Sequence, residues 1–129
     1  MATAQLTGPP ARPTEADLRE VVAREFALFG PGVPGDDERV RSLLHPSFLE
    51  HGASGQVWDG TSVPAVISGT DAPIEAAELR TRYLGADAVL VTCRSRRPGR
   101  EALRNSVWLR AADAGWLLLF HQGTVCAAR

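Results

Sequence analysis

The sequence contains no lysine, because all 14 of its basic residues are arginine. A Schiff base on a lysine side chain is therefore excluded. The two cysteines, Cys93 and Cys126, belong to no Cys-x-x-Cys pair and are too few for a zinc site, so we expect free thiols. The three histidines lack metal-ligand spacing, and no phosphate loop or dinucleotide fingerprint is present. We expect neither a metal nor a cofactor.

Strong charge and long apolar runs are also lacking. The net charge is −1, which gives no broad positive field for nucleic acid or an anionic membrane. The "RSRRPGR" run is explained by solvated arginines at a strand end and turn. "WLLLF" is far too short to span a membrane, and the N-terminus lacks the pattern of a signal peptide. These features predict a soluble, cytoplasmic protein with no nucleic-acid or membrane partner.

The remaining sequence reads as a single domain over 14–129 after a flexible tail, 1–13, that is rich in Ala, Thr, Gly and Pro. Thr14 is a candidate helix cap, and Gly30 ends the helix. The apolar residues expected to face the core of this helix are Leu18, Val22, Phe26 and Phe29. A second short helix is expected from 36 or 37 to His45-Pro46, and a third from 61 or 62 to Gly69.

Six strands are expected around these helices, at 48–52, 56–59, 74–84, 88–96, 102–110 and 115–124. Glycine, proline and aspartate supply the turns between the four long strands. Helices followed by a run of antiparallel strands indicate an α+β fold, with the helices gathered on one face of a curved antiparallel or mixed sheet.

Alternation separates the two faces of the strands. In 102–110, one face carries Arg104, Ser106, Trp108 and Arg110. In 115–124, one face carries Trp116, Leu118, Phe120 and Gln122, and the other carries Leu117, Leu119 and His121. Both faces of this last strand are largely apolar, although helices can cover only one. A second copy of the chain is the simplest cover for the outer face, so we expect a homodimer.

The order of elements, together with "FLEHGASGQVWDG", "SVWLR" and "GWLLLFHQGT", resembles the nuclear transport factor 2-like superfamily and its SnoaL-like branch. The resemblance covers nearly all of the chain after Thr14. It implies a cone-shaped sheet wrapped around the N-terminal helices, with a pocket at the open end and dimers through the outer sheet face. The superfamily includes ketosteroid isomerase, polyketide cyclases and a kinase association domain, so fold alone does not fix function.

The resemblance also suggests site residues. The catalytic carboxylate of ketosteroid isomerase falls on His51, and the neighbouring Glu50 would point the opposite way, to the surface or an interface. An imidazole suits proton transfer at neutral pH, but His51 could equally fix the shape of its loop. Arg94 and Ser106 match positions that project into the pocket of the association domain. Arg94 could stabilise an anion, or it could form an ion pair with Glu78 or Glu101.

Further residues are candidates for ligand binding. Trp58 and Trp108 could form a pocket wall or pack in the core, whereas Trp116 fits the core better. Either His121 or Gln122 could reach the pocket, but their alternation allows only one of them. Phe26 of the first helix is a further candidate for contact with the ligand.

Two functions remain open at this point. One is a cofactor-independent isomerase, cyclase or dehydratase that acts on a small apolar or aromatic substrate. His51 would then move the proton, and Arg94 or Ser106 would stabilise negative charge. The other is a non-catalytic dimeric module for ligand binding or association.

Overall fold

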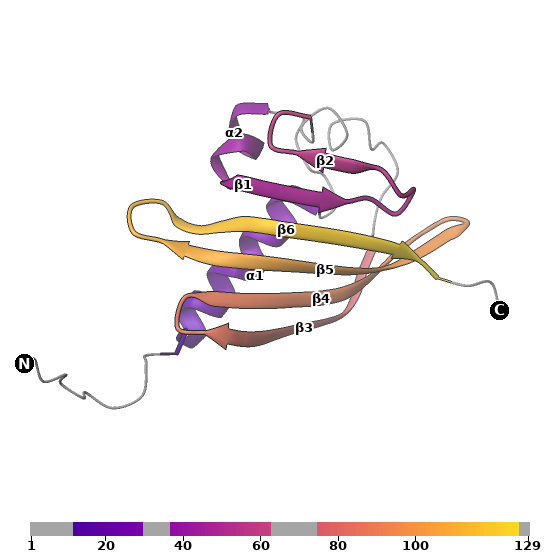
Figure 1. Cartoon of the computed structure of the whole chain (residues 1–129). Helices are drawn as coiled ribbons and strands as arrows, with labels where there is room; N and C mark the ends of the chain where they lie inside the picture. The colour runs from indigo at the N-terminus through magenta and orange to yellow at the C-terminus, as the bar shows by residue number, and fades with distance from the viewer. Residues whose placement is uncertain (1–11, 30–36, 63–74, 127–129) are drawn as a thin grey trace, which may run out of the picture.

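The computed structural model describes residues 12–29, 37–62 and 75–126. Figure 1 shows one mixed sheet crossed by a helix, with strand order β2-β1-β6-β5-β4-β3. The elements in chain order are α1 (Glu15–Phe29), α2 (Asp37–Ser42), β1 (Leu44–His51), β2 (Val57–Asp59), β3 (Glu75–Gly85), β4 (Ala88–Arg97), β5 (Arg100–Ala111) and β6 (Gly115–Val125). The α+β class expected from the sequence is confirmed.

The cap of α1 forms as expected. Thr14 Oγ1 accepts a hydrogen bond from the N–H of Asp17 at 3.1 Å, and the Asp17 carboxylate accepts one from the N–H of Thr14 at 2.8 Å. This reciprocal pairing satisfies two N–H groups that the first turn leaves open.

The buried face of α1 differs from the expected one. Val21, Glu25 and Leu28 are buried, whereas Phe26 is 39% exposed. The expected buried stripe through Val22 and Phe26 is therefore wrong, because the buried face of α1 is rotated by part of a turn from it. The seven-residue spacing from Leu18 to Glu25 and from Val21 to Leu28 also fits one face of a helix. The apolar pattern does not include Glu25, although this residue lies on the buried face.

The chain between α1 and β3 agrees only in part with expectation. The second helix forms but ends at Ser42, and β1 begins at Leu44 rather than at residue 48. At the tip of the β1–β2 hairpin, the N–H of Gly52 bonds to the carbonyl of Gln56, and Gly55 takes a positive φ of 90°. The expected tail 1–13 and the third helix lie mostly in 1–11 and 63–74, which are outside the described residues.

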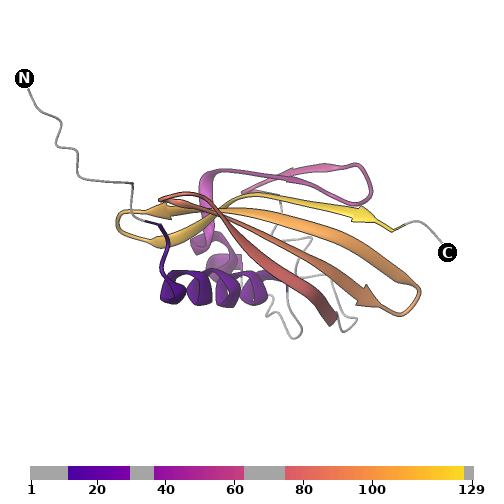
Figure 2. The same cartoon turned by 90° about the horizontal axis from the view of Figure 1, so that it is seen from below.

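The four long strands form the expected antiparallel meander, and β1 joins it by pairing in parallel with β6. Figure 2 shows α1 lying across one face of this curved sheet. We call that face the inner face and the opposite one the outer face. The buried residues of the core are Val21, Leu28, Val40, Leu44, Phe48, Val89, Val91, Trp108, Trp116 and Leu118.

A β-bulge in β6 changes which residues share a face. The register shifts where Val107 pairs with Phe120 but Trp108 pairs with Leu118, so one extra residue is inserted between them. Such an insertion reverses the alternation beyond it. The expected grouping of Trp116 and Leu118 with Phe120 and Gln122 is therefore wrong. Buried His121, rather than Gln122, lies on the inner face.

Both cysteines are free thiols, as expected. No helix in the described residues is long and apolar enough to cross a membrane.

Candidate functional site

A row of side chains crosses the inner face over four strands. Strand register aligns Trp58 of β2 with Glu50 of β1, Glu50 with His121 of β6, and His121 with Ser106 of β5. Glu50, His121 and Ser106 are all buried. Paired residues in neighbouring strands project to the same face. The fold thus gathers an acid, an imidazole and a hydroxyl from segments far apart in the sequence.

Glu25 of α1 closes this row from above the sheet. Its two carboxylate oxygens accept hydrogen bonds from Ser106 Oγ at 3.0 Å and from the indole Nε1 of Trp108 at 2.9 Å. Burial raises the pKa of Glu25, and the bonds from Trp108 and Ser106 oppose that rise. Trp108 therefore packs in the core and also holds a buried carboxyl group in place.

The hydrogen-bond partners of His121 fix its tautomer. Its Nδ1 lies 2.7 Å from Ser106 Oγ, and its Nε2 lies 3.5 Å from Arg104 Nη1. Arginine can only donate, so Nε2 accepts and Nδ1 carries the hydrogen. Ser106 then receives the bond from Nδ1–H and donates its own hydrogen to Glu25. Burial, and then the charge of Arg104, lower the pKa of His121 to about 3, so this imidazole is neutral.

Glu50 is the least satisfied group in the row. Its side chain is buried, and its Oε1 has no hydrogen-bond partner among the described residues. Burial raises the pKa of Glu50 to about 7, with Arg104 opposing the rise and Glu25 adding to it. The expectation that Glu50 points to the surface or an interface is wrong, because it is buried on the inner face. A carboxyl group with this pKa can both take and give a proton near neutral pH.

Arg104 lies beside this row on the inner face. Its Nε donates to Ser95 Oγ at 2.8 Å, and Ser95 is itself buried. The guanidinium passes over Gly123 of β6, where a Cβ atom would come within 3.2 Å of Nη1. A residue without a side chain thus lets Arg104 reach across β6 towards β1.

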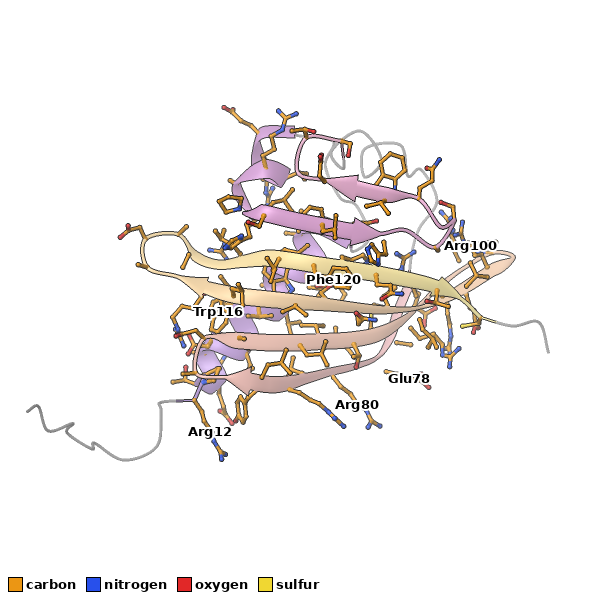
Figure 3. All side chains as sticks on the ribbon, viewed as in Figure 1. Arg12, Glu78, Arg80, Arg100, Trp116 and Phe120 are labelled. Atoms are coloured by element: carbon orange, nitrogen blue, oxygen red, sulfur yellow. The ribbon has the colours of Figure 1, made fainter. Side chains whose placement is uncertain are left out.

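His51 does not join the inner-face row. It follows Glu50 in β1, is exposed, and pairs with Gln122 on the outer face. Its ring meets Phe120 edge-on, with the ring centroids 5.1 Å apart; Figure 3 labels Phe120 on β6. The expected position of His51 beside Trp108 and Ser106 is therefore wrong, because adjacent strand residues point to opposite faces and Glu50 takes the inner one.

A cavity of about 370 Å³ lies beside His51, at the end of β1 and β6. Its lining consists of His51, Gly52, Ala53, Gly55, Val57, Gln122, Gly123 and Thr124. His51 and Gln122 thus lie together in this cavity, apart from the inner-face row.

Arg94 is likewise absent from the inner face. It pairs with Leu103, which is 49% exposed on the outer face. The guanidinium of Arg94 forms ion pairs with Glu78 at 3.1 Å and with Glu101 at 3.2 Å. The alternative of an ion pair across strands is confirmed, with both partners. These bonds raise the pKa of Arg94, with the bond to Glu78 contributing most.

The other candidates divide between the two faces as well. Half-buried Trp58 packs against the core in the same row as Glu50, and Trp116 is core, as expected. Phe26 is largely exposed on α1. The structure therefore brings together Ser106, Trp108, His121 and Trp58, and leaves His51, Arg94, Gln122 and Phe26 outside.

The inner-face row, together with Glu25, Trp108 and Arg104, forms what we call the inner-face cluster. Three of its members, Glu25, Glu50 and Arg104, were not among the site residues expected from the sequence. Arg104 shares a strand face with Ser106 and Trp108, and that alternation could have identified it. The spacing of Glu25 from Leu18 was a similar signal on α1. Within the described residues, no group of three or more His, Cys, Asp or Glu side chains could hold a metal ion.

No family model and no curated protein matches the chain. Several solved structures do match it in fold. A nuclear transport factor 2-like protein from Cytophaga hutchinsonii is 18% identical, with a TM-score of 0.66 over 88% of this chain and 99% of that one. A candidate calcium/calmodulin-dependent kinase II association domain from Exiguobacterium sibiricum is 16% identical, with a TM-score of 0.67 over 92% of this chain and 98% of that one.

A candidate ketosteroid isomerase from Parabacteroides distasonis is 9% identical, with a TM-score of 0.62 over 82% of this chain and 85% of that one. At such low identities these likenesses show the fold alone. The chain has the nuclear transport factor 2-like fold, and the expectation of that fold is confirmed.

Proposed function

We propose that the inner-face cluster is the site of a small-molecule enzyme that needs no cofactor and works by acid-base catalysis. Its reaction class would be that of an isomerase, cyclase or dehydratase, as in the SnoaL-like branch. Glu50 takes the role that the sequence suggested for His51. The observation that carries the proposal is the buried Glu50 carboxyl group, whose Oε1 has no partner within the described part of the chain and whose pKa is about 7.

The chemistry follows from these groups. The Glu50 carboxylate takes a proton from a carbon next to a carbonyl. The electron pair of the broken C–H bond then forms a C=C bond, and the carbonyl π pair moves onto the oxygen to give an enolate. The protonated Glu50 then returns the proton, at the same carbon or at another one. Because its pKa lies near neutrality, both protonation states are populated at physiological pH.

The residues around Glu50 support this role through their positions. Neutral His121 separates Glu50 from Ser106 in the row and cannot itself supply a positive charge. The bonds from Ser106 and Trp108 hold the Glu25 carboxyl close enough to influence Glu50. Glu25 is therefore a positioning residue that helps to keep a proton on Glu50.

Proton exchange tests this assignment even though the native substrate is unidentified. A panel of small ketones and keto acids is incubated with the protein in D₂O, and loss of the α-proton signal is followed by NMR. We expect Glu50→Gln to slow enzyme-dependent exchange by about 10² to 10⁴, the usual range for a lost acid-base group. Glu101→Gln, on the outer face, is the matched control and should exchange at the wild-type rate.

A folded Glu50→Gln protein that exchanges as fast as the wild type would refute the assignment. The same holds if no compound of the panel shows exchange above the background without protein.

The second candidate function is a dimeric association module. The outer face favours it, because strand register aligns Leu49, Phe120 and Val107 there in one apolar row that continues to Leu90. Leu49 is 37% exposed although apolar. A second copy that packs its sheet on this row would remove the row from water.

A further inference from the structure

Three arginines share one end of the inner face. Arg97 ends β4, Arg100 begins β5, and the two pair with each other across the turn. Arg104 lies further along β5, with buried Ala102 between Arg100 and Arg104 on the same face. All three arginines are half-buried. Figure 3 labels Arg100 beside the turn that joins β4 and β5.

The same two strands pair their outer-face arginines with acids. Arg96 lies 3.4 Å from Glu101, and Arg94 contacts both Glu78 and Glu101. In contrast, none of the three inner-face arginines has an ion pair within 4.0 Å in the described part of the chain. The Nε of Arg100 is buried without a hydrogen-bond partner there. Among the described residues, positive charge is thus concentrated on the inner face without an ion pair to an acid.

These arginines also act on one another. Burial lowers the pKa of Arg104, and the charges of Arg100 and Arg97 lower it further, whereas Glu50 opposes them. Three cations held this close repel each other, and partial burial reduces the screening by water. An anion placed among them would relieve the repulsion and accept charge-assisted hydrogen bonds.

The guanidinium of Arg104 is fixed by neutral groups. Ser95 and neutral His121 accept bonds from its Nε and Nη1, and Gly123 leaves the space that it crosses. Its direction therefore does not depend on an ion pair within the described part of the chain. Glu50 is the acid that most strongly affects Arg104, yet the two are not within ion-pair distance of each other. The Arg104 guanidinium and the Glu50 carboxyl group, whose Oε1 has no hydrogen-bond partner among the described residues, therefore influence each other without direct contact.

We infer that Arg97, Arg100 and Arg104 bind the anionic group of a small organic acid, whose acidic C–H or O–H lies against Glu50. This inference rests on the proposed function and narrows its substrate class from a small apolar compound to an anionic one. The shared chemistry of the bound group is an oxyanion. A carboxylate and a phosphate ester both provide one, and a comparison of probes distinguishes them.

The charges around Glu50 give this site a pH signature. Arg104 of β5 stays positive, His121 of β6 is neutral, and Cys93 of β4, whose pKa is raised by burial, is a neutral thiol. Glu50 of β1 loses negative charge as the pH falls through its pKa of about 7, and burial also raises the pKa of Glu25 of α1. The loss of charge on Glu50 favours an incoming anion, so binding should be tighter at pH 6 than at pH 8.

Isothermal titration tests the inference with pyruvate, succinate and inorganic phosphate as probes, on the full chain. We expect at least one probe to bind, and Arg100→Gln and Arg104→Gln each to weaken its binding by about tenfold or more, as a lost charge-assisted bond does. Arg96→Gln, on the same strand as Arg97 but facing outwards, is the matched control. It should bind as the wild type does.

Binding of pyruvate or succinate but not phosphate would identify a carboxylate site. Binding of phosphate but of neither organic acid would identify a phosphate site. The inference is overturned if no probe binds at 10 mM, or if Arg96→Gln weakens binding as much as Arg100→Gln does. Far-UV circular dichroism reports the folding of each variant, and Arg100→Gln carries the test should Arg104→Gln unfold. Arginine-dependent binding without proton exchange would support this site while refuting the proposed catalysis. If Glu50→Gln loses proton exchange but no anion binds, the catalysis is supported and this anion site is refuted.

Discussion

The protonation of Glu50 should make the stability of the whole protein depend on pH. Burial raises the pKa of this carboxyl group from its usual 4.5 to about 7 in the folded chain. Between these two values the folded state holds a proton that the unfolded state has released. The free energy of unfolding therefore falls as the pH rises through this range, and it levels off above the folded-state pKa.

The size of the effect follows from the two pKa values. They differ by about 2.5 pH units, and each unit corresponds to about 1.4 kcal/mol, so full ionisation of Glu50 costs the fold roughly 3 kcal/mol. Glu50→Gln keeps the shape of the side chain but cannot ionise. Relative to the wild type, it should gain stability of this order between pH 5 and pH 8.

Urea denaturation at half-unit steps from pH 5 to pH 8 measures this difference, with intrinsic tryptophan fluorescence as the probe. Glu101→Gln, an exposed acid of the outer face, is the control, and its difference from the wild type should stay nearly constant. A flat difference between Glu50→Gln and the wild type across the range would show that Glu50 has an ordinary pKa. The inner-face cluster would then lack a group suited to proton transfer near neutral pH.

Four further outcomes are expected. Ser106→Ala removes one of the two hydrogen bonds to the buried Glu25 carboxyl, so urea denaturation should show a loss of about 1–3 kcal/mol. His51→Ala should leave the rate of proton exchange within about twofold of the wild type, since the His51 ring lies on the outer face. A fall in this rate of about 10² would restore His51 as the proton-transfer group. Arg110 holds the pKa of Asp17 well below its usual 3.8, so the Asp17 carboxylate stabilises the fold at neutral pH and loses this effect as acid protonates it. The difference in urea midpoint between Asp17→Asn and the wild type should therefore shrink from pH 7 to pH 2. Leu49→Glu should halve the mass measured by light scattering if the outer face joins two copies, and an unchanged dimer would exclude this row from the contact.

Much of the fold could be predicted from local patterns. The four long strands differ from their expected bounds by at most two residues, because glycine, proline and aspartate mark their turns. Gly99 and Gly115 take positive φ at two of these turns, where side chains rarely fit. The cap at Thr14 was predictable for a similar reason, since an acid three residues later completes a local pair of hydrogen bonds.

The composition of the site depended on features that local patterns do not contain. Strict alternation grouped Trp116 and Leu118 with Phe120 and Gln122, but the bulge in β6 reverses the alternation between Leu118 and Phe120. In β1, the adjacent residues Glu50 and His51 must point to opposite faces. Both are polar, so a preference for burying apolar side chains did not show which of them faces inwards. Glu25 was not among the expected site residues, because a glutamate in a helix is normally exposed and its partners Ser106 and Trp108 come from a distant strand.

The placement of charge in this protein is itself an argument for function. On the outer face, Arg94 and Arg96 are paired with Glu78 and Glu101, as stability alone would favour. On the inner face, Glu25 and Glu50 are buried with raised pKa values, and nearby arginines lack ion pairs within the described residues. Replacing such buried charges by apolar side chains commonly leaves a fold unchanged or more stable. Ionisation of Glu50 in the interior costs the fold stability, and the proposed proton-transfer site with its bound anion would account for both the acids and the arginines.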